Sequence, residues 1–246
     1  MDVLAVTGLS KSYDGVRALH DVSFSVRQGE LVAMIGPNGA GKTTSFNLVN
    51  GQIRPDSGKI LLNEANITGL RPRDIWRRGV GRTFQLAAAF GSMSARENVQ
   101  TALLSHRGLL RSFFKPAKNI LAAEAAALLE RVGLADQAER PCAELAYGDL
   151  KRVELAMALA NRPRLLLMDE PAAGMAPEER EALMIFVKNL SKQNGIAVLF
   201  TEHDVDVVFG FADRVIVLHA GEVIAAGAPA QVRADPRVRE VYLGDA

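Results

Sequence analysis

The stretch GPNGAGKTT occupies residues 36–44 and decides how the chain folds. It follows the apolar run LVAMI, Leu31 to Ile35, and precedes the helix-like segment SFNLVNG. Glycines let backbone N–H groups approach a ligand and adopt torsions that a Cβ would forbid. A glycine loop between a buried strand and a helix N-terminus offers those N–H groups and a partial positive charge to an anion. The stretch therefore predicts a phosphate-binding loop.

The spacing of this loop matches the P-loop pattern, in which a lysine and a hydroxyl residue close a glycine-rich turn. Lys42 is expected to reach the β and γ phosphates of a nucleotide, and Thr43 to bind Mg²⁺. An ordinary glycine turn is the alternative, but the four fixed positions arise by chance in roughly one chain of this length per hundred. The loop that would hold the nucleotide consists of Gly36, Pro37, Asn38, Gly39, Ala40, Gly41, Lys42, Thr43 and Thr44.

A second apolar run, LLLM at residues 165–168, ends directly in two carboxylates, Asp169 and Glu170. In P-loop proteins a carboxylate at the end of a second buried strand holds the Mg²⁺, and Asp169 is placed for that role. Glu170 is then the candidate general base, or water-polarising group, for attack on the γ phosphate. Successive strand residues point to opposite faces, but the chain turns where a strand ends, so both acids can face one site. A structural pair of surface acids is the alternative.

Hydrophobic periodicity predicts an α/β fold. Continuous apolar runs separated by helical stretches are typical of parallel strands buried on both faces. Residues 3–9 and 22–26 alternate instead and predict antiparallel strands. Between about residues 87 and 149 the strand signals give way to helical spacing. We therefore expect one domain over residues 1–246, with a RecA-like P-loop NTPase core at about 1–86 and 150–246. An antiparallel β subdomain and an inserted α-helical subdomain at about 87–149 complete it. The four apolar runs are residues 31–35, 165–168, 196–200 and 215–218.

Composition narrows the class of protein. The net charge of +1 lacks the basic excess of proteins that neutralise many phosphates, so nucleic acid is not an expected partner. Apolar residues at 48% and charged residues at 23% argue against a disordered or fibrous chain. Cys142 is the single cysteine, which rules out an intrachain disulfide and fits a reducing compartment. No run of about 18 apolar residues occurs, so we do not expect the chain to cross a membrane by itself.

Three further motifs follow the glycine loop in a fixed order. TFQ ends at Gln85, LAYGDLKR spans residues 145–152, and TEHD surrounds His203. Together with the P-loop and LLLMDEP, they make the chain resemble the nucleotide-binding subunit of ATP-binding cassette (ABC) transporters across nearly its whole length. The resemblance implies an ATPase whose cofactors are ATP and Mg²⁺, and whose hydrolysis drives transmembrane transport.

The resemblance also implies roles for single residues. Tyr13 would stack on adenine, with a core tyrosine as the alternative. Gln85 would touch Mg²⁺ or the attacking water and begin the segment that links the nucleotide to the membrane partner. His203 would contact the γ phosphate, with an incidental histidine as the alternative. The expected catalytic residues are thus Glu170, His203, Gln85 and Lys42, and the expected metal ligands are Thr43, Gln85 and Asp169.

LAYGDLKR departs at three positions from the LSGGQ signature that is common in the family. Ala146 replaces the serine, Tyr147 the first glycine and Asp149 the glutamine, whereas Gly148 remains. In the family this loop opens a helix and caps the γ phosphate bound to the opposite subunit. Loss of the serine hydroxyl removes one hydrogen bond of about 1 kcal/mol. Backbone donors remain, so we still expect nucleotide contact through residues 146–149 and an active ATPase. Asp149 would repel a phosphate, and Lys151 follows it closely; the sequence does not decide whether the lysine offsets that repulsion.

The loop AAGMAPEE after the two acids occupies the family's dimer-contact loop, where an aspartate is usual. Gly174, Met175 and Ala176 offer no carboxylate there, which puts the usual polar contact between subunits in doubt. Main-chain contacts are the alternative.

The motif count predicts the assembly. The chain has one P-loop and one signature, so two cassettes would meet head to tail around two ATP molecules, as a homodimer or with a related chain. The resemblance adds transmembrane permease subunits and, indirectly, an extracytoplasmic solute-binding protein. It places the chain peripherally on the cytoplasmic face of the inner membrane. Leu86, Phe90 and Met93, after Gln85, are candidate permease contacts, with core packing as the alternative.

LAYGDLKR, EPAAGM and the terminal VYLGDA resemble the ATPases of bacterial importers of branched-chain or hydrophobic amino acids. Cassettes for urea or short amides and for lipopolysaccharide export are alternatives, because they share parts of this pattern. A soluble ABC ATPase without a transport role and a nucleotide-binding scaffold that does not hydrolyse ATP are alternatives of other classes. The substrate contacts would lie on other chains, so the residues here do not name the solute.

Overall fold

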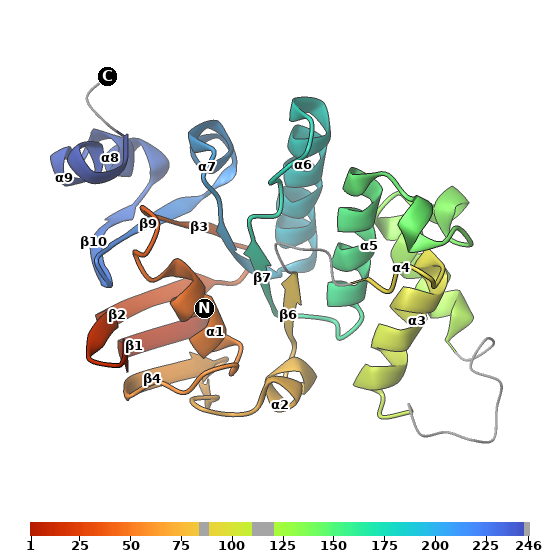
Figure 1. The fold of residues 1–246 in the computed structure, drawn as a ribbon, viewed down its shortest axis with the longest axis horizontal. Helices are drawn as coiled ribbons and strands as arrows, with labels where there is room; N and C mark the ends of the chain where they lie inside the picture. Colours follow the sequence, from red (N-terminus) through yellow and green to blue (C-terminus); the bar gives the residue numbers. More distant parts are fainter. Residues whose placement is uncertain (84–88, 110–120, 244–246) are drawn as a thin grey trace.

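The computed structural model describes residues 1–83, 89–109 and 121–243 and contains two sheets (Figure 1). The larger sheet has the strand order β10-β9-β3-β8-β7-β6, and the smaller has the order β2-β1-β4-β5. The strands are β1 (Asp2–Tyr13), β2 (Val16–Arg27), β3 (Leu31–Ile35), β4 (Ser57–Leu62), β5 (Ala65–Asn66), β6 (Val80–Thr83), β7 (Leu165–Asp169), β8 (Ala197–Thr201), β9 (Arg214–His219) and β10 (Glu222–Gly227).

The centre of the larger sheet is parallel, as the continuous apolar runs predict. β3 pairs in parallel with β8 and β9, and β7 pairs in parallel with β6 and β8. Alternate residues of each central strand enter two different cores. In β3, for example, Leu31, Ala33 and Ile35 face one core, and Val32 and Met34 face the other. Burial on both faces explains why these strands are apolar throughout.

Helices cover one face of the larger sheet, and the smaller sheet with α1 covers the other (Figure 1). A separate helical region, formed by α3, α4 and α5, lies beside the sheets at one end of the molecule. The α-helices are α1 (Lys42–Val49), α2 (Pro72–Arg77), α3 (Ala95–His106), α4 (Ala122–Arg131), α5 (Tyr147–Leu159), α6 (Pro177–Asn194), α7 (Val205–Phe211), α8 (Pro229–Ala234) and α9 (Pro236–Val238). Short turns of other helix types are η2 (Ala135–Gln137), η3 (Cys142–Glu144) and η4 (Arg239–Leu243).

The first two strands are longer than their alternating patterns predict. β1 and β2 pair from Asp2 opposite Arg27 to Tyr13 opposite Val16. The extra pairs follow from the turn at Asp14 and Gly15, both of which have positive φ. Asp-Gly is a strong signal for a tight hairpin, and a tight hairpin carries the pairing out to its tip even where the side chains are polar. β10 is a further antiparallel strand, and sequence reasoning did not predict it; its residues are partly buried or exposed.

Helical signals in the middle of the chain correspond to real helices. Ser94 caps α3 with a reciprocal capping box to Glu97, and Gly133, with a φ of 75°, follows α4 where a stop was expected. Across residues 89–109 and 121–149 the structure forms helices, turns and one isolated bridge between Ser94 and Pro141. Among the described residues, no helix has the length and apolar character needed to span a bilayer.

Parallel pairing brings several strand ends together. β3 leads into the glycine loop, β7 ends at Asp169 and β8 ends at Thr201. Because carboxyl ends of parallel strands meet at one edge of a sheet, these three segments lie side by side. This edge is the place where the candidate site forms.

Candidate nucleotide site

Two glycines of the loop are required by their surroundings. A Cβ on Gly36 would lie 2.0 Å from the carbonyl oxygen of Leu218, and a Cβ on Gly41 would lie 2.7 Å from that of Ala18. Gly41 also has a φ of 104° and is the residue before the first turn of α1. These glycines therefore let the loop pack against β9 and β2 while its backbone stays on the open side.

Lys42 is the residue of the loop that reaches across it. Its side chain is 8% exposed, and its Nζ donates to the carbonyl oxygens of Gly36 at 2.6 Å and Pro37 at 3.1 Å. Burial lowers the pKa of Lys42, and the negative charges of Glu170 and Asp169 oppose that shift. The lysine thus lies within electrostatic range of both acids, although more than 120 residues separate them in the chain.

Asp169 is held between two neighbouring strands. Thr201, at the end of β8, donates its hydroxyl to Oδ1 of Asp169 at 2.8 Å. Arg82, near the end of β6, forms an ion pair with Oδ2 at 3.5 Å and also donates to Asn47 of α1 at 2.8 Å. Contacts from both sides fix the direction of this carboxylate, as a metal-binding carboxylate requires.

Glu170 is the residue at which the chain turns. Its φ of 48° lies in the left-handed region, which non-glycine residues rarely adopt and which costs about 1–3 kcal/mol. The backbone N–H of Glu170 donates to the carbonyl oxygen and the hydroxyl of Thr201, both at 3.1 Å. The turn keeps the Glu170 side chain on the same side as Asp169, where its Oε1 lies 2.8 Å from Nε2 of His203.

Glu202 is a buried carboxylate to which sequence reasoning gave no role. It is 4% exposed and accepts the backbone N–H of Ala172 at 2.8 Å and that of His203 at 3.2 Å. Burial raises the pKa of Glu202, and these two N–H groups oppose the shift. The residue ties the turn after the two acids to the segment that carries His203. The available signal was a charged residue at the end of a buried strand, in LFTEHD.

The signature segment opens a helix, as the resemblance implies. Ala146 is the residue before α5, and no side chain caps the first turn. The ring of Tyr147 is 43% exposed and lies against Gly174, whose Cβ would be 3.4 Å from Cε1 of the tyrosine. A Cβ on Gly148 would lie 3.2 Å from the carboxylate of Glu179. A side chain at position 148 would therefore require the exposed Glu179 carboxylate to shift by a few tenths of an ångström.

Lys151, two residues after Asp149, is a buried residue of α5. The lysine is buried, with its Nζ 3.7 Å from Glu154 and 5.6 Å from the centre of the Tyr147 ring. Two of its contacts are thus with residues of α5 itself.

The chain brings part of the expected site together. Lys42, Asp169, Glu170 and His203 meet at one edge of the larger sheet, whereas the start of α5 lies in the helical region, with β6 and β7 between it and α1 (Figure 1). A single chain therefore does not place the signature on its own glycine loop.

Of the remaining expected residues, Tyr13 and Thr43 are described by the structure, and Gln85 is not. Tyr13 is 44% exposed at the tip of the β1–β2 hairpin, and the same hairpin contacts Gly41 through Ala18. Its exposure disagrees with the core alternative. Thr43 is exposed in the first turn of α1, beside the partly buried Thr44. Gln85 and Leu86 lie outside the described residues, so their expected contacts are not described.

The donor set at this edge fits a magnesium ion. Mg²⁺ prefers oxygen ligands and is usually held by one or two carboxylates, water and substrate phosphates. Thr43 supplies a hydroxyl, and Asp169 supplies a carboxylate that neighbouring side chains already orient.

Two protein-family models match the chain. One, described as ABC transporter, covers residues 19–173, which is more than half of the chain. The other, described as branched-chain amino acid ATP-binding cassette transporter, covers residues 222–246.

Curated proteins match over almost the full length. The chain is 40% identical to the high-affinity branched-chain amino acid transport ATP-binding protein LivG of Salmonella typhimurium, covering 99% of this chain and 98% of that protein. It is 39% identical, with the same coverage, to the corresponding protein BraF of Pseudomonas aeruginosa. It is also 38% identical to the lipopolysaccharide export system ATP-binding protein LptB of Acidithiobacillus ferridurans, again covering 99% and 98%.

Solved structures match in the same way. The ADP conformation of an ATP-binding cassette of an ABC transporter superposes with a TM-score of 0.90 at 31% identity and covers 100% of both chains. A dimeric cassette in a post-hydrolysis state, bound to ADP and Pi, has a TM-score of 0.78 at 26% identity and covers 92% of this chain and 98% of that chain. The likeness therefore extends over the whole fold rather than over the glycine loop alone.

Proposed function

The chain belongs to the ABC transporter family of ATP-binding subunits, and from this premise we propose that it powers import of branched-chain or other hydrophobic amino acids into a bacterial cell. It is an ATPase of the P-loop fold. The match of residues 222–246 to the branched-chain amino acid cassette family supports this choice of solute, as do the names of the relatives LivG and BraF.

The observation that carries the proposal is the meeting of Lys42, Asp169, Glu170 and His203 at one edge of the sheet. In the proposed mechanism the phosphates lie on the backbone N–H groups of residues 36–44. Lys42 exchanges its bonds to Gly36 and Pro37 for bonds to phosphate oxygens. Because the Lys42 ammonium already donates hydrogen bonds to carbonyl oxygens of the loop, it needs to move only a short distance when the nucleotide binds.

The two acids take separate roles in this proposal. Asp169 and Thr43 would hold Mg²⁺, which would supply positive charge beside the β and γ phosphates. Glu170 orients the attacking water and accepts a proton from it. His203 contacts the γ phosphate and, through its bond to Oε1, fixes the direction of the Glu170 carboxylate. The positive φ at Glu170 supports this division, because it turns the second acid toward the first.

We also propose that two cassettes assemble head to tail, as a homodimer or with a related chain. The start of α5 stands apart from the glycine loop of its own chain, and the structural relative bound to ADP and Pi is dimeric. Residues 146–149 of one cassette would then cap the γ phosphate on the other, through backbone N–H groups at the start of a helix. Tyr13 would stack on the adenine.

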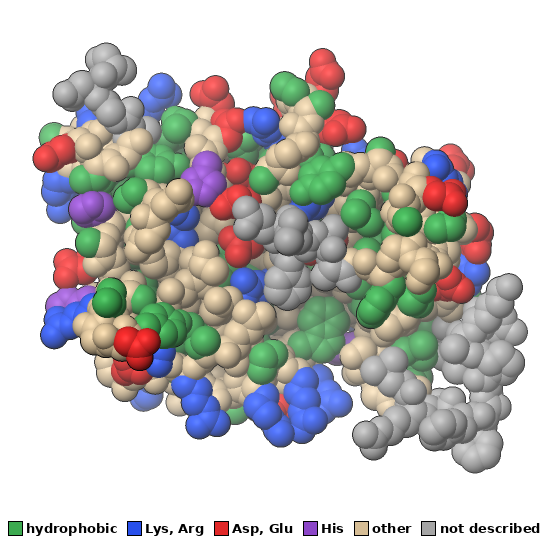
Figure 2. Space-filling view, in the orientation of Figure 1, with side chains coloured by type: hydrophobic (Ala, Val, Ile, Leu, Met, Phe, Trp, Pro, Cys, Tyr) green, Lys and Arg blue, Asp and Glu red, His purple; other side chains and the backbone are tan. Residues whose placement is uncertain are grey.

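Permease subunits in the membrane are the proposed partners, with a solute-binding protein acting on them from outside. Phe90 supports this docking, because it is 56% exposed directly after the Gln85 segment. Basic side chains gather where Figure 1 places α2, as Figure 2 shows, and they include Arg71, Arg73, Arg77 and Arg78, all exposed. Such a patch suits a peripheral position at the cytoplasmic surface, where anionic lipids attract basic residues.

Lipopolysaccharide export is a second candidate function, favoured by the 38% identity to LptB over almost the whole chain. The match of residues 222–246 to the amino acid cassette family favours import. The partner chains determine whether the complex imports amino acids or exports lipopolysaccharide, so the experiment requires the native complex.

The test is ATP turnover by the complex purified from its native membrane and reconstituted with its permease. We expect stimulation by an extracytoplasmic binding protein loaded with leucine, isoleucine or valine, and none by lipopolysaccharide. Stimulation of ATP turnover by lipopolysaccharide alone would contradict the import proposal and support lipopolysaccharide export. Stimulation by ribosomes or DNA in place of a permease would contradict a transport role.

A further inference from the structure

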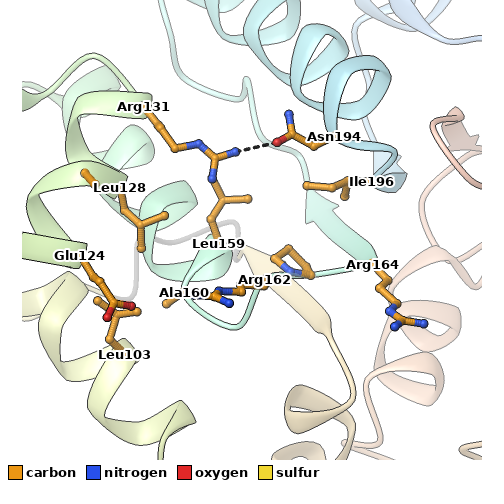
Figure 3. Close-up of a pocket in the computed structure, with 12 residues that line it drawn as sticks. Leu103, Glu124, Leu128, Arg131, Leu159, Ala160, Arg162, Arg164, Asn194 and Ile196 are labelled. Carbon is orange, nitrogen blue, oxygen red and sulfur yellow. Dashed lines mark hydrogen bonds between the residues drawn. The ribbon is translucent and has the colours of Figure 1, made fainter. Parts of the chain in front are cut away.

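A cavity of about 510 Å³ lies between the helical region and the larger sheet, away from the nucleotide site (Figure 3). Arg164 lies just before β7 and Ile196 just before β8, so this end of the cavity is at the amino ends of the parallel strands. The glycine loop and the two acids lie at the carboxyl ends. The cavity is therefore separate from the site described above.

Aliphatic side chains form much of the wall. Leu103, Leu128 and Leu159 come from α3, α4 and α5, and all three are almost completely buried. No aromatic residue is among the described residues that line the cavity, so it offers no ring on which a base could stack. The apolar lining is Leu103, Leu128, Leu159, Ala160, Pro163 and Ile196.

Three arginines stand at this apolar wall. Arg131 donates to Oδ1 of Asn194 at 3.1 Å, across the space between α4 and the end of α6 (Figure 3). The side chains of Arg162 and Arg164 are exposed, and they have neither a hydrogen bond nor a carboxylate partner in the described part of the chain. The one acid of the lining, Glu124, is already bound to Arg107 by hydrogen bonds of 2.6 and 2.7 Å. The solvent-exposed mouth of the cavity thus carries positive charge beside the aliphatic residues of the lining.

We propose that this cavity binds an aliphatic carboxylate of medium chain length. A carboxylate matches the planar fork of an arginine, and Arg162 lies beside Ala160 at the wall of the cavity, whereas Arg164 extends away from it (Figure 3). The aliphatic wall suits a hydrocarbon chain, and the volume falls in the range of cavities that hold small organic ligands, about 300–1,000 Å³. A branched-chain amino acid shares the same chemistry in shorter form, but its hydrocarbon part would reach fewer of the lining residues.

The position of the cavity links it to the signature helix. Leu159 and Ala160, which line it, are the last residue of α5 and the residue that follows. The helix begins at Tyr147, about 18 Å away at 1.5 Å per residue. A ligand in the cavity would touch the far end of the helix that carries the nucleotide cap, and it would bridge the helical region to the sheet. Any effect of the ligand on ATP affinity would be matched by an equal effect of ATP on ligand affinity.

The test is calorimetric titration of the full chain with octanoate, with octan-1-ol as the uncharged analogue. The substitution Arg162→Asn removes the charge at a residue whose φ is 51°, a conformation that asparagine tolerates. Ala127→Trp fills the cavity from an exposed position of α4 and leaves the buried core unchanged. Arg54→Asn, at an exposed arginine outside the cavity, is the matched control for charge.

We expect octanoate to bind the wild-type chain with at least tenfold higher affinity than octan-1-ol, because the carboxylate forms a charge-assisted bond. Arg162→Asn should weaken octanoate about tenfold or more, Ala127→Trp should abolish binding, and Arg54→Asn should stay within twofold of wild type. Leucine and 4-methyl-2-oxopentanoate should bind at least tenfold more weakly than octanoate. Tighter binding of either short acid would overturn the assignment of chain length.

Two results would overturn the site itself. The first is no binding of octanoate to the wild-type chain. The second is equal binding by wild type, Arg162→Asn and Ala127→Trp, which would mean that octanoate binds elsewhere. The nucleotide site is a separate structure, so ATP binding by all these variants reports whether they are folded.

Discussion

The two halves of the nucleotide machinery are built differently. At the carboxyl edge of the sheet, the candidate catalytic side chains are oriented by hydrogen bonds to other side chains. Thr201 bonds to Asp169, and His203 bonds to Glu170. At the start of α5, Ala146 offers no capping group and Gly148 no side chain at all. The edge of the sheet thus presents oriented side chains of a single chain. The start of α5 presents mainly backbone N–H groups. The difference agrees with the proposal that the residues for hydrolysis lie within one chain, whereas the cap comes from a second cassette.

The largest effect is expected for Glu170→Gln, which tests whether the side chains at the sheet edge carry out hydrolysis. If Glu170 is the base, turnover should fall by about 10² or more while ATP still binds, because the amide accepts no proton from water. The variant should also accumulate as a closed dimer with ATP. Phosphate release in single turnover and size-exclusion chromatography with ATP measure both effects. Undiminished hydrolysis would remove Glu170 from the mechanism.

Lys42→Ala tests the other side of the same edge. Loss of a charged donor to phosphate should weaken ATP binding about 10- to 100-fold, since such a hydrogen bond contributes about 1.5–3 kcal/mol. Titration with a fluorescent ATP analogue measures the change, and Lys192→Ala, at a surface lysine on α6, serves as control. Unchanged affinity would contradict the assignment of residues 36–44 as the phosphate loop.

Gly148→Val tests the backbone half. The added side chain would meet the Glu179 carboxylate and push it aside, and its methyl groups would crowd the start of α5, where the proposed cap offers its backbone N–H groups. We expect ATP-dependent dimerisation of the Glu170→Gln protein to weaken about tenfold when this change is added. ATP binding to the monomer should stay as it was. A loss of monomer binding instead would mean that α5 contacts the nucleotide within one chain.

Glu202→Gln tests how the catalytic edge is held. The pKa of Glu202 is raised in the folded chain, so its contribution to stability is complete below the ordinary carboxyl range and is lost as pH rises through the folded pKa. Urea unfolding of wild type should therefore lose stability relative to Glu202→Gln from about pH 4.5 upward. Parallel curves for the two proteins would show that burial does not govern this carboxylate.

The smallest effect is expected for Ala146→Ser, which restores a capping hydroxyl before α5. A serine at this position stabilises a helix by about 1 kcal/mol relative to alanine. Urea unfolding should show the gain, whereas ATP turnover should change little because the backbone donors are already present. A large rise in turnover would mean that the hydroxyl, and not the backbone, is the missing part of the cap.

Much of the fold follows from local sequence. The apolar runs predict the parallel strands, and the P-loop spacing puts Lys42 at the start of a helix. Strand ends then bring Asp169 and His203 to the same edge, because parallel strands finish together. These predictions work because each depends on a few neighbouring residues and one rule of geometry.

The parts that sequence reasoning missed depend on contacts between strands. Thr201 and Arg82 act on Asp169 from two other strands, and nothing in their own neighbourhoods signals this. Glu202 reads as an ordinary acid until burial and two backbone donors give it a structural role. The full length of β1 was missed for a different reason: its last residues are polar, and the Asp14–Gly15 turn, not burial, keeps them paired.

The tight fit between Gly148 and Glu179 ties two distant positions of the chain to one design rule. A larger residue at 148 requires the Glu179 side chain to move or to be shortened, so the two positions are best redesigned together. Anyone who transplants a different cap motif into this cassette should therefore carry the matching residue of α6 with it.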